Sequence, residues 1–142
     1  MKAVFTDADL FALIPQRPPI VMVDLLQNVT ESEAETGLLI KEDNIFVQNG
    51  QMQEPGLIEH IAQSAAAFAG FRGYASGEEP RLGYIGELKR LFLYARPNAG
   101  ARLNTHLRVL GEAAGITLLA AETKVGDEVV AAGQMKIFLK ED

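Results

Sequence analysis

Four polar side chains interrupt an otherwise apolar segment between residues 55 and 71: Glu59, His60, Gln63 and Ser64. A carboxylate, an imidazole and a hydroxyl are the groups that enzymes use for acid–base and nucleophilic chemistry. If the segment is a helix, Glu59 and Gln63 share one face, because residues four apart are neighbours on a helix surface. This spacing predicts a carboxyl group that is oriented by an amide. His60 and Ser64 are also four residues apart and share another face of the helix.

Glu59 is the group best suited to give and take a proton. A carboxyl group one turn into a buried helix is unfavourable unless it is hydrogen-bonded or functional. Burial in general favours the neutral form of a carboxyl group, and this brings proton transfer into the physiological range. We therefore predict that Glu59 is a catalytic acid or base. The alternative is helix capping, since negative charge is favoured in the first turns of a helix.

The other polar residues have less definite roles. His60 lies about 100° around a helix from Glu59, so a core or dimer-contact role stands beside a catalytic one. Asn49 precedes the helix and cannot act as a base, but its amide can orient a water molecule or a substrate hydroxyl. No base for Ser64 is evident, which argues against a nucleophilic serine. His106 alternates with charged residues and is predicted to be solvated.

One helix and several antiparallel strands are predicted to position these groups. The helix begins at Pro55 and extends to about Ala69, with alanines that let a curved sheet close tightly around it. A short helix is expected at residues 7–13 and a functional loop at 43–54. Strands are predicted at 20–26, 33–40, 81–94 with a bulge near 87–90, 102–109, 116–125 and 129–139. The order of elements indicates an α+β fold.

Composition limits the classes of protein that fit. A chain of 142 residues suits one domain, residues 1–142. No apolar stretch is long enough to span a bilayer and no signal peptide is evident, so no membrane partner is expected. The absence of cysteine excludes disulfides and thiolate chemistry and fits a cytoplasmic protein. A net charge of -6 without a basic stripe argues against nucleic acid, and two distant histidines argue against a metal site. No cofactor is expected.

Three segments, in order, resemble the 3-hydroxyacyl-acyl-carrier-protein dehydratases of fatty acid synthesis. Residues 13–24 (LIPQRPPIVMVD) are similar to the family's opening, where Pro-His-Arg precedes an apolar strand that ends in Asp. Residues 55–63 (PGLIEHIAQ) resemble the start of its helix, and residues 96–103 resemble its late turn. Residues 43–46 and 83–86 look closer to a divergent branch that includes dehydratases of aryl-polyene and flexirubin-type pigment pathways. The resemblance implies a hotdog fold, in which a curved antiparallel sheet wraps around a long helix.

The resemblance also implies a reaction and an assembly. The reaction is the reversible loss of water from a 3-hydroxyacyl thioester on acyl carrier protein, which gives a 2-enoyl thioester. In the family, a histidine on the loop before the helix faces an acid on the partner's helix, so a homodimer, or a heterodimer with a related hotdog subunit, is implied. Glu59 matches the acid by its spacing to Gln63, but the loop 46–52 contains no histidine. The base that removes the C2 proton stays open between His60, a water held by Asn49, and Glu59 acting twice.

Substrate contacts are predicted at three positions. Backbone N–H groups at a helix N-terminus can polarise a thioester carbonyl, and Gly56 is the candidate because glycine allows close approach. Gln63 would orient the acid, and Phe68 would line an acyl channel, with core packing as the alternative. A local basic patch would be needed to dock an acidic carrier protein, with scattered solvated charges as the alternative. The candidates for this patch are Arg72, Arg81, Lys89 and Arg90.

Two other functions fit the same fold. In a thioesterase, a helix carboxylate activates water or attacks the thioester directly. In a non-catalytic subunit, the chain would bind an acyl group or a catalytic partner. Enoyl formation from a 3-hydroxyacyl thioester would favour dehydration, whereas release of free thiol would favour the thioesterase. A metal-dependent enzyme ranks last.

Overall fold

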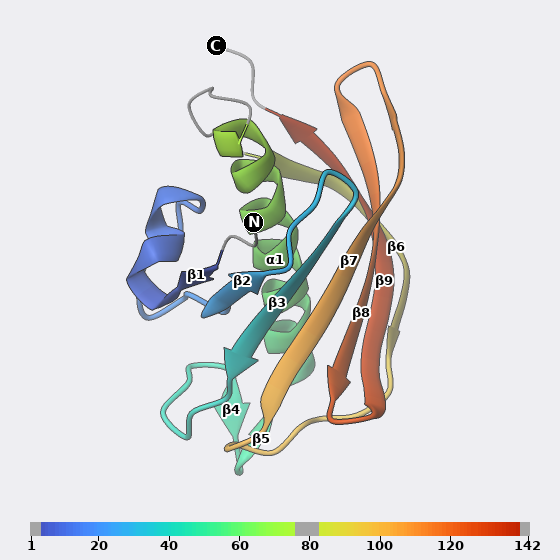
Figure 1. The fold of residues 1–142 in the computed structure, drawn as a ribbon. Coiled ribbons are helices and arrows are strands. Elements are labelled where there is room, and N and C mark those ends of the chain that lie inside the picture. Colours follow the sequence, from blue (N-terminus) through green and yellow to red (C-terminus); the bar gives the residue numbers. More distant parts are fainter. Residues whose placement is uncertain (1–3, 76–82, 140–142) are drawn as a thin grey trace.

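The structure, a computed structural model, describes residues 4–75 and 83–139, in which one long helix lies against a curved antiparallel sheet (Figure 1). The helices are the 3₁₀ helix η1 (Asp7–Ala12) and the α-helix α1 (Glu54–Ala75). The strands of the main sheet are β1 (Phe5–Thr6), β2 (Leu25–Gln27), β3 (Glu33–Leu39), β6 (Gly83–Leu93), β7 (Arg102–Ala113), β8 (Ile116–Val125) and β9 (Glu128–Leu139). A second, small sheet is the hairpin of β4 (Val47–Gln48) and β5 (Gln51–Met52).

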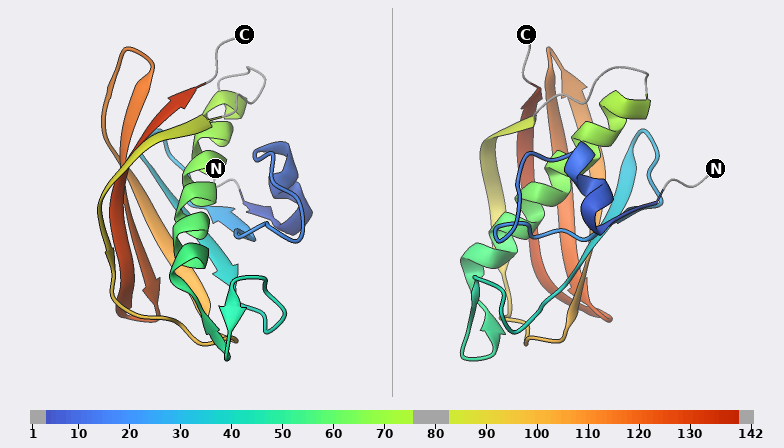
Figure 2. Two further views of the ribbon diagram at one scale, coloured as in Figure 1. Left: turned by 180° about the vertical axis from the view of Figure 1, so that it is seen from behind. Right: turned by 90° about the vertical axis from the view of Figure 1, so that its left-hand side faces the viewer.

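The main sheet has the strand order β1-β2-β3-β7-β8-β9-β6, with antiparallel pairing throughout. Strand β6 follows α1 in sequence and returns to the far edge beside the last strand of the chain. Figure 2 shows this curved sheet on one side of α1 and the N-terminal segment with η1 on the other. The helix is therefore enclosed from both sides, which is why it is apolar nearly all round.

The core forms where the inner face of the sheet meets α1. Along β7, Leu103, Thr105 and Leu107 are buried and the residues between them are exposed, because successive strand side chains point to opposite faces. From the helix, Ile61 and Phe68 pack into the same cluster as Leu107. Small side chains elsewhere on α1 let the N-terminal segment approach from the opposite side.

Most predicted elements are present, and the differences have physical causes. The α+β prediction is confirmed, and β6 has register breaks between Ile85 and Glu87 and between Lys89 and Phe92, close to the expected bulge. The predicted start of this strand at Arg81 lies outside the described residues. The predicted strand 20–26 is wrong in extent, since only β2 is strand. Residues 20–22 instead bond to side chains of α1.

Two further differences concern the helix and the loop before it. The helix continues to Ala75, beyond its predicted end near Ala69. Gly70 lies within the helix, and its lack of a side chain leaves room for the backbone of Leu13. The predicted loop 43–54 contains the β4–β5 hairpin, whose tight turn is Asn49-Gly50, with φ of 55° and 75°. Asn-Gly is a favoured pair for such a turn, because both positions need positive φ.

The close contact between Gly70 and Leu13 should affect the free energy of unfolding. A Cβ at this position would lie 2.6 Å from the carbonyl oxygen of Leu13, which is backbone and cannot move independently. Alanine normally stabilises a helix interior by about 1 kcal/mol relative to glycine. We expect Gly70→Ala to destabilise the protein instead, by about 1–3 kcal/mol, because overpacking displaces the N-terminal segment.

Urea unfolding of Gly70→Ala measures this effect. Gly111→Ala on β7 is the control, because a Cβ there meets nothing within 4 Å. We expect the midpoint of the control to stay close to wild type. A Gly70→Ala midpoint at or above wild type would show that the helix and Leu13 do not pack as described.

Candidate active site

Glu59 and Gln63 form the predicted pair on one face of α1. The Glu59 side chain is half-buried, and its Oε2 accepts a hydrogen bond of 2.8 Å from Gln63 Nε2. Gln63 itself is only 1% exposed. A buried amide with fixed partners therefore holds a carboxyl group that solvent can still reach. The orienting contact expected from the four-residue spacing is present.

The segment 20–22 supplies the other partners of Gln63. The Met22 backbone N–H donates to Gln63 Oε1 at 2.6 Å, and Gln63 Nε2 donates to the Ile20 carbonyl at 2.8 Å. These bonds replace the strand pairing that the apolar sequence of this segment had suggested. The N-terminal segment is thus attached to α1 at the level of the acid, and it forms one wall beside Glu59.

His60 occupies a core position on the next face of the helix. It is 0% exposed, with Nδ1 2.7 Å from the Met22 carbonyl and Nε2 2.7 Å from Thr105 Oγ1. Burial lowers the pKa of His60 from 6.5 to about 4, although the bond to Met22 and the charge of Asp24 act in the opposite direction. The ring is therefore neutral at pH 7, and neither nitrogen is available to a substrate in this chain. A catalytic role for His60 stays a prediction that this geometry does not support.

The first turn of α1 differs from the expected carbonyl-binding site. A Cβ on Gly56 would lie 2.6 Å from Phe46 Cβ and 3.0 Å from Met52 Cγ, so the glycine admits the side chain of Phe46 rather than a substrate. Its N–H also donates to the Gln53 carbonyl at 2.9 Å. The polarisation of a thioester by Gly56 therefore stays a prediction that this geometry does not support. Asn49 is exposed, and the backbone of its hairpin turn accounts for its residue type, so its catalytic role stays a prediction.

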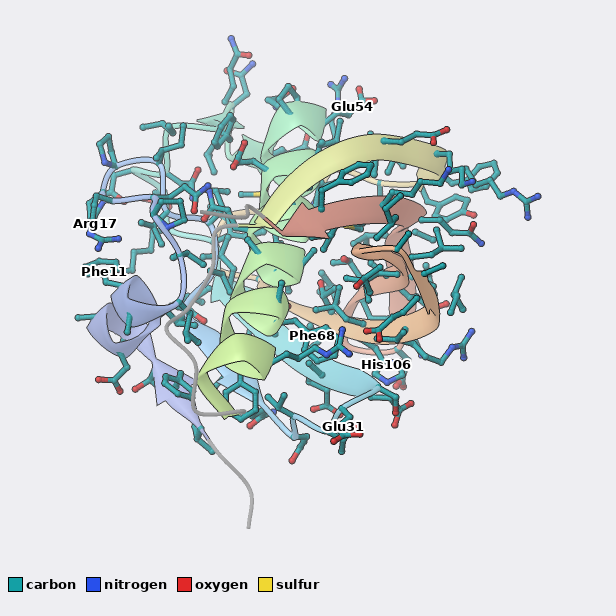
Figure 3. The ribbon with its side chains drawn as sticks, turned by 90° about the horizontal axis from the view of Figure 1, so that it is seen from above. Phe11, Arg17, Glu31, Glu54, Phe68 and His106 are labelled. Atoms are coloured by element: carbon teal, nitrogen blue, oxygen red, sulfur yellow. The ribbon has the colours of Figure 1, made fainter. Side chains whose placement is uncertain are left out.

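Phe68 lies on the opposite side of α1 from Glu59. It is nine positions further along, and about 100° per residue brings it about half a turn around the helix. Figure 3 shows Phe68 on the sheet-facing side, where it is 1% exposed. There it lines a cavity of about 900 Å³ together with Phe71, Leu119 and Ile137. The geometry therefore argues against Phe68 as an acyl contact beside Glu59 of the same chain.

Charged side chains also line that cavity, among them Arg72 and Glu112. Arg72 forms an ion pair with Glu112 on β7, and its guanidinium carbon lies 5.7 Å from the centroid of the Phe68 ring. Arg72 is thus paired with a carboxylate at the C-terminal part of α1, whereas Lys89 and Arg90 lie on β6. The fourth candidate, Arg81, lies outside the described residues. The patch stays a prediction that these positions do not support as a whole.

His106 and the carboxylates other than Glu59 are also candidate metal ligands. His106 is exposed as predicted, with Nε2 3.3 Å from Glu33 Oε1 on the neighbouring strand β3. Within residues 4–75 and 83–139, no group of three or more His, Cys, Asp or Glu side chains could hold a metal ion. Among the same residues, no helix has the length and apolarity required to cross a membrane.

The fold defines a class of protein. A long antiparallel sheet wrapped around one central helix is the hotdog fold, as the resemblance had implied. The chain belongs to the ApeP-like family, described as ApeP dehydratase, whose family model matches residues 8–142. The predicted membership of a divergent dehydratase branch is thereby confirmed.

The individual relatives described next have sequence identities of 29% or less to this chain. An uncharacterised Bacillus subtilis (strain 168) protein, YcsD, is 29% identical over 133 residues, which cover 89% of this chain and 95% of YcsD. The dehydratase heterocomplex ApeI:P from Xenorhabdus doucetiae has a similar chain, with a TM-score of 0.84 at 16% identity over 94% of this chain and 91% of that one. Cj0977, a sigma28-regulated virulence protein from Campylobacter jejuni, has a TM-score of 0.71 at 12% identity, over 92% and 85%. At these identities the structural similarities establish the fold alone.

The buried His60 predicts how stability depends on pH. Its pKa is about 4 in the folded chain and 6.5 without burial, so the unfolded chain binds more protons between these values. Folding stability should therefore be fully present above about pH 6.5 and decrease as the pH falls towards 4. Applied to this single group, the linkage relation gives a total loss on the order of 3 kcal/mol.

Urea unfolding at several pH values measures this dependence. His60→Asn should reduce the slope between pH 6.5 and 4, whereas His106→Asn, which changes the exposed histidine of β7, should retain it. Equal slopes for His60→Asn and wild type would mean that His60 is not buried and neutral.

Proposed function

We propose that this chain is a dehydratase subunit that removes water from a 3-hydroxyacyl thioester on acyl carrier protein and forms a 2-enoyl thioester. The pathway we propose is the synthesis of an aryl polyene or a related fatty-acid-type chain. Membership of the ApeP-like dehydratase family supports the reaction type. The observation that carries the proposal is the half-buried Glu59 carboxyl group held by Gln63, because it is an oriented acid on the central helix.

In the proposed reaction, a base removes the proton from C2 and the C–H electron pair forms the C2–C3 double bond. The C3–O bond breaks, and Glu59 gives its proton to the departing oxygen, which leaves as water. Proton transfer of this kind from a positioned side chain accelerates a reaction by about 10²–10⁴-fold. Return of the proton from the base to Glu59 restores both groups for another turnover.

The C2 base is the part of the mechanism that we do not assign to the described residues of this chain. Both ring nitrogens of His60 are engaged in buried hydrogen bonds, and the loop 46–52 has no histidine. Among the described residues, the recorded hydrogen-bond partner of the Glu59 carboxyl group is the Gln63 amide, which cannot act as a base. We therefore propose that a related hotdog subunit supplies the base. The structural neighbour ApeI:P is described as a dehydratase heterocomplex, which supports this arrangement.

Strand β6 is our proposed contact with the partner subunit. It is the edge of the main sheet nearest to α1, and an edge strand presents backbone groups that can pair with another chain (Figure 2). Its Ile85 and Phe92 side chains are 38% and 54% exposed. On the helix, Ile58 and Ala62 are partly exposed on either side of Glu59 in sequence. A partner on this edge would reach the half-buried acid and complete the site.

Replacement of the acid tests the proposed chemistry. Glu59→Gln keeps the shape of the side chain but has no transferable proton, so we expect enoyl formation from a carrier-bound 3-hydroxyacyl thioester to fall by about 10²–10⁴-fold. The matched control is Glu54→Gln on the same helix. That carboxylate is exposed and its Oε1 lies 2.9 Å from Arg96 Nη2, so the control should keep nearly the full rate.

The enoyl absorbance and the release of free thiol are recorded together in this assay. Wild-type rates in Glu59→Gln would remove Glu59 from the site. Thiol release without enoyl formation would replace the proposal with a thioesterase, for which the same carboxylate activates water. Unchanged output of the assembled complex after Glu59→Gln would identify the chain as a non-catalytic subunit.

Assembly with a second subunit is a separate prediction. We expect the chain alone to have little dehydratase activity, and a one-to-one complex with a histidine-containing hotdog subunit of a dehydratase to gain it. Mass photometry or light scattering measures the stoichiometry, and the enoyl assay measures activity at each mixing ratio. Full activity of the isolated chain would show that the base lies within this sequence or in its second copy.

A further inference from the structure

The orientation of the Gln63 amide is fixed by backbone groups. The Met22 N–H can only donate, so the atom 2.6 Å from it must be the amide oxygen, Oε1. The Ile20 carbonyl can only accept, so the atom 2.8 Å from it must be the amide nitrogen, Nε2. Rotation of the amide by half a turn would break both bonds at once. The assignment of its oxygen and nitrogen is therefore determined by chemistry.

This orientation determines what the Glu59 carboxyl group can do at each oxygen. An amide nitrogen has two hydrogens, and Gln63 Nε2 gives one to Ile20 and the other to Glu59 Oε2 at 2.8 Å. Oε2 must therefore act as an acceptor. A proton on Oε2 that pointed at this amide would place two hydrogens against each other. When Glu59 carries its proton, the favourable position is Oε1.

A second chain of hydrogen bonds holds Met22 from the other side. Since the Met22 carbonyl accepts, His60 Nδ1 carries the hydrogen, and the neutral ring leaves Nε2 as an acceptor for the hydroxyl of Thr105, 2.7 Å away. Thr105 has then used its hydrogen, so it accepts from Thr123 Oγ1 at 2.7 Å. His60, Thr105 and Thr123 are all at most 1% exposed. The direction of every bond from β8 to Glu59 is thereby fixed.

We propose that Gln63 and His60 are positioning residues that reserve Glu59 Oε2 as an acceptor and so place the transferable proton of Glu59 on Oε1. The inference rests on the proposed function, because it concerns the proton that Glu59 gives to the leaving hydroxyl. His60 acts at one remove: it holds the carbonyl of Met22, and the N–H of the same residue holds the Gln63 amide oxygen. Oε1 has no recorded hydrogen bond within the described residues, and it is the oxygen that meets the substrate.

Nuclear magnetic resonance tests the network without substrate. In ¹⁵N-labelled wild type, we expect the His60 ring to carry its hydrogen on Nδ1 and to remain neutral between about pH 6 and pH 8. His106 provides the comparison within the same sample, because its side chain is exposed on β7. A hydrogen on Nε2 of His60, or a ring that titrates in this range, would overturn the inference.

Infrared spectroscopy tests the position of the proton on Glu59. With the proton on Oε1, Oε2 is the carbonyl oxygen, and its bond from Gln63 lowers the C=O stretching frequency. Spectra of protein with ¹³C-labelled glutamate carboxyl groups, at a pH where Glu59 is protonated, identify its band by comparison with Glu59→Gln. Gln63→Leu should move this band to higher frequency. An unmoved band would show that Oε2 is not the accepting carbonyl.

Kinetics of the assembled enzyme separate positioning from folding. Gln63→Leu and His60→Leu should lower kcat by roughly 10- to 100-fold with KM changed by less than about twofold, as expected for a misplaced catalytic group. His60→Asn, which can still donate to the Met22 carbonyl, should recover part of the loss. Thr36→Val is the control, because it removes a buried 2.7 Å bond to Ser64 of α1 outside this network. Its kcat should stay near wild type.

The outcomes separate the inference from the proposed function. If Glu59→Gln abolishes dehydration but Gln63→Leu and His60→Leu keep the wild-type kcat, the positioning role is wrong and Glu59 remains the acid. If Thr36→Val loses kcat as strongly as His60→Leu, the loss reflects general destabilisation, and this also overturns the positioning role. If Glu59→Gln retains activity, the proposed function fails, whereas the resonance and infrared results can still confirm the hydrogen-bond network.

Discussion

The arrangement of the site depends on a single amide. Gln63 connects the acid of α1 to the extended segment 20–22, and that segment in turn connects the helix to the N-terminal part of the fold. An unpaired buried amide would be unfavourable by about 1–3 kcal/mol. Because the partners of Gln63 are mainly backbone groups, the contact constrains the path of the chain and not only the rotamer of one side chain.

The small residues of α1 make this constraint possible. Gly70 allows the Leu13 carbonyl to approach the helix backbone, and Gly56 admits Phe46 beside the first turn. Because both sides of the helix are covered, its polar side chains occupy one of three environments. His60 is hydrogen-bonded in the core, and the Gln63 amide connects two segments of the chain. The third environment is a position that neighbouring segments leave partly exposed to solvent. Of these three residues, Glu59 alone is in the third environment, and for that reason we propose it as the group that transfers a proton.

Local pattern in the sequence predicted much of this arrangement. Local sequence pattern predicted β7 at residues 102–109, and it predicted β8 and β9 at 116–125 and 129–139, since strand period is a local property. The spacing of Glu59 and Gln63 predicted their contact for the same reason. Helix geometry could also have predicted that Phe68 faces away from Glu59, because nine positions correspond to about two and a half turns.

The errors arose where a contact distant in sequence outweighs a local preference. Residues 20–26 form a mainly apolar run typical of a strand, yet backbone groups of Ile20 and Met22 bond to side chains about 40 positions later, and no local pattern encodes such a bond. Tertiary packing likewise places Phe46 beside Gly56, where the sequence suggested space for a ligand. The proposed partner base has the same cause, because a group supplied by another chain leaves no pattern in this sequence. In that proposal this chain contributes an acid with an orienting amide, and the partner's base faces C2 of the substrate while the free oxygen of Glu59 faces the C3 hydroxyl.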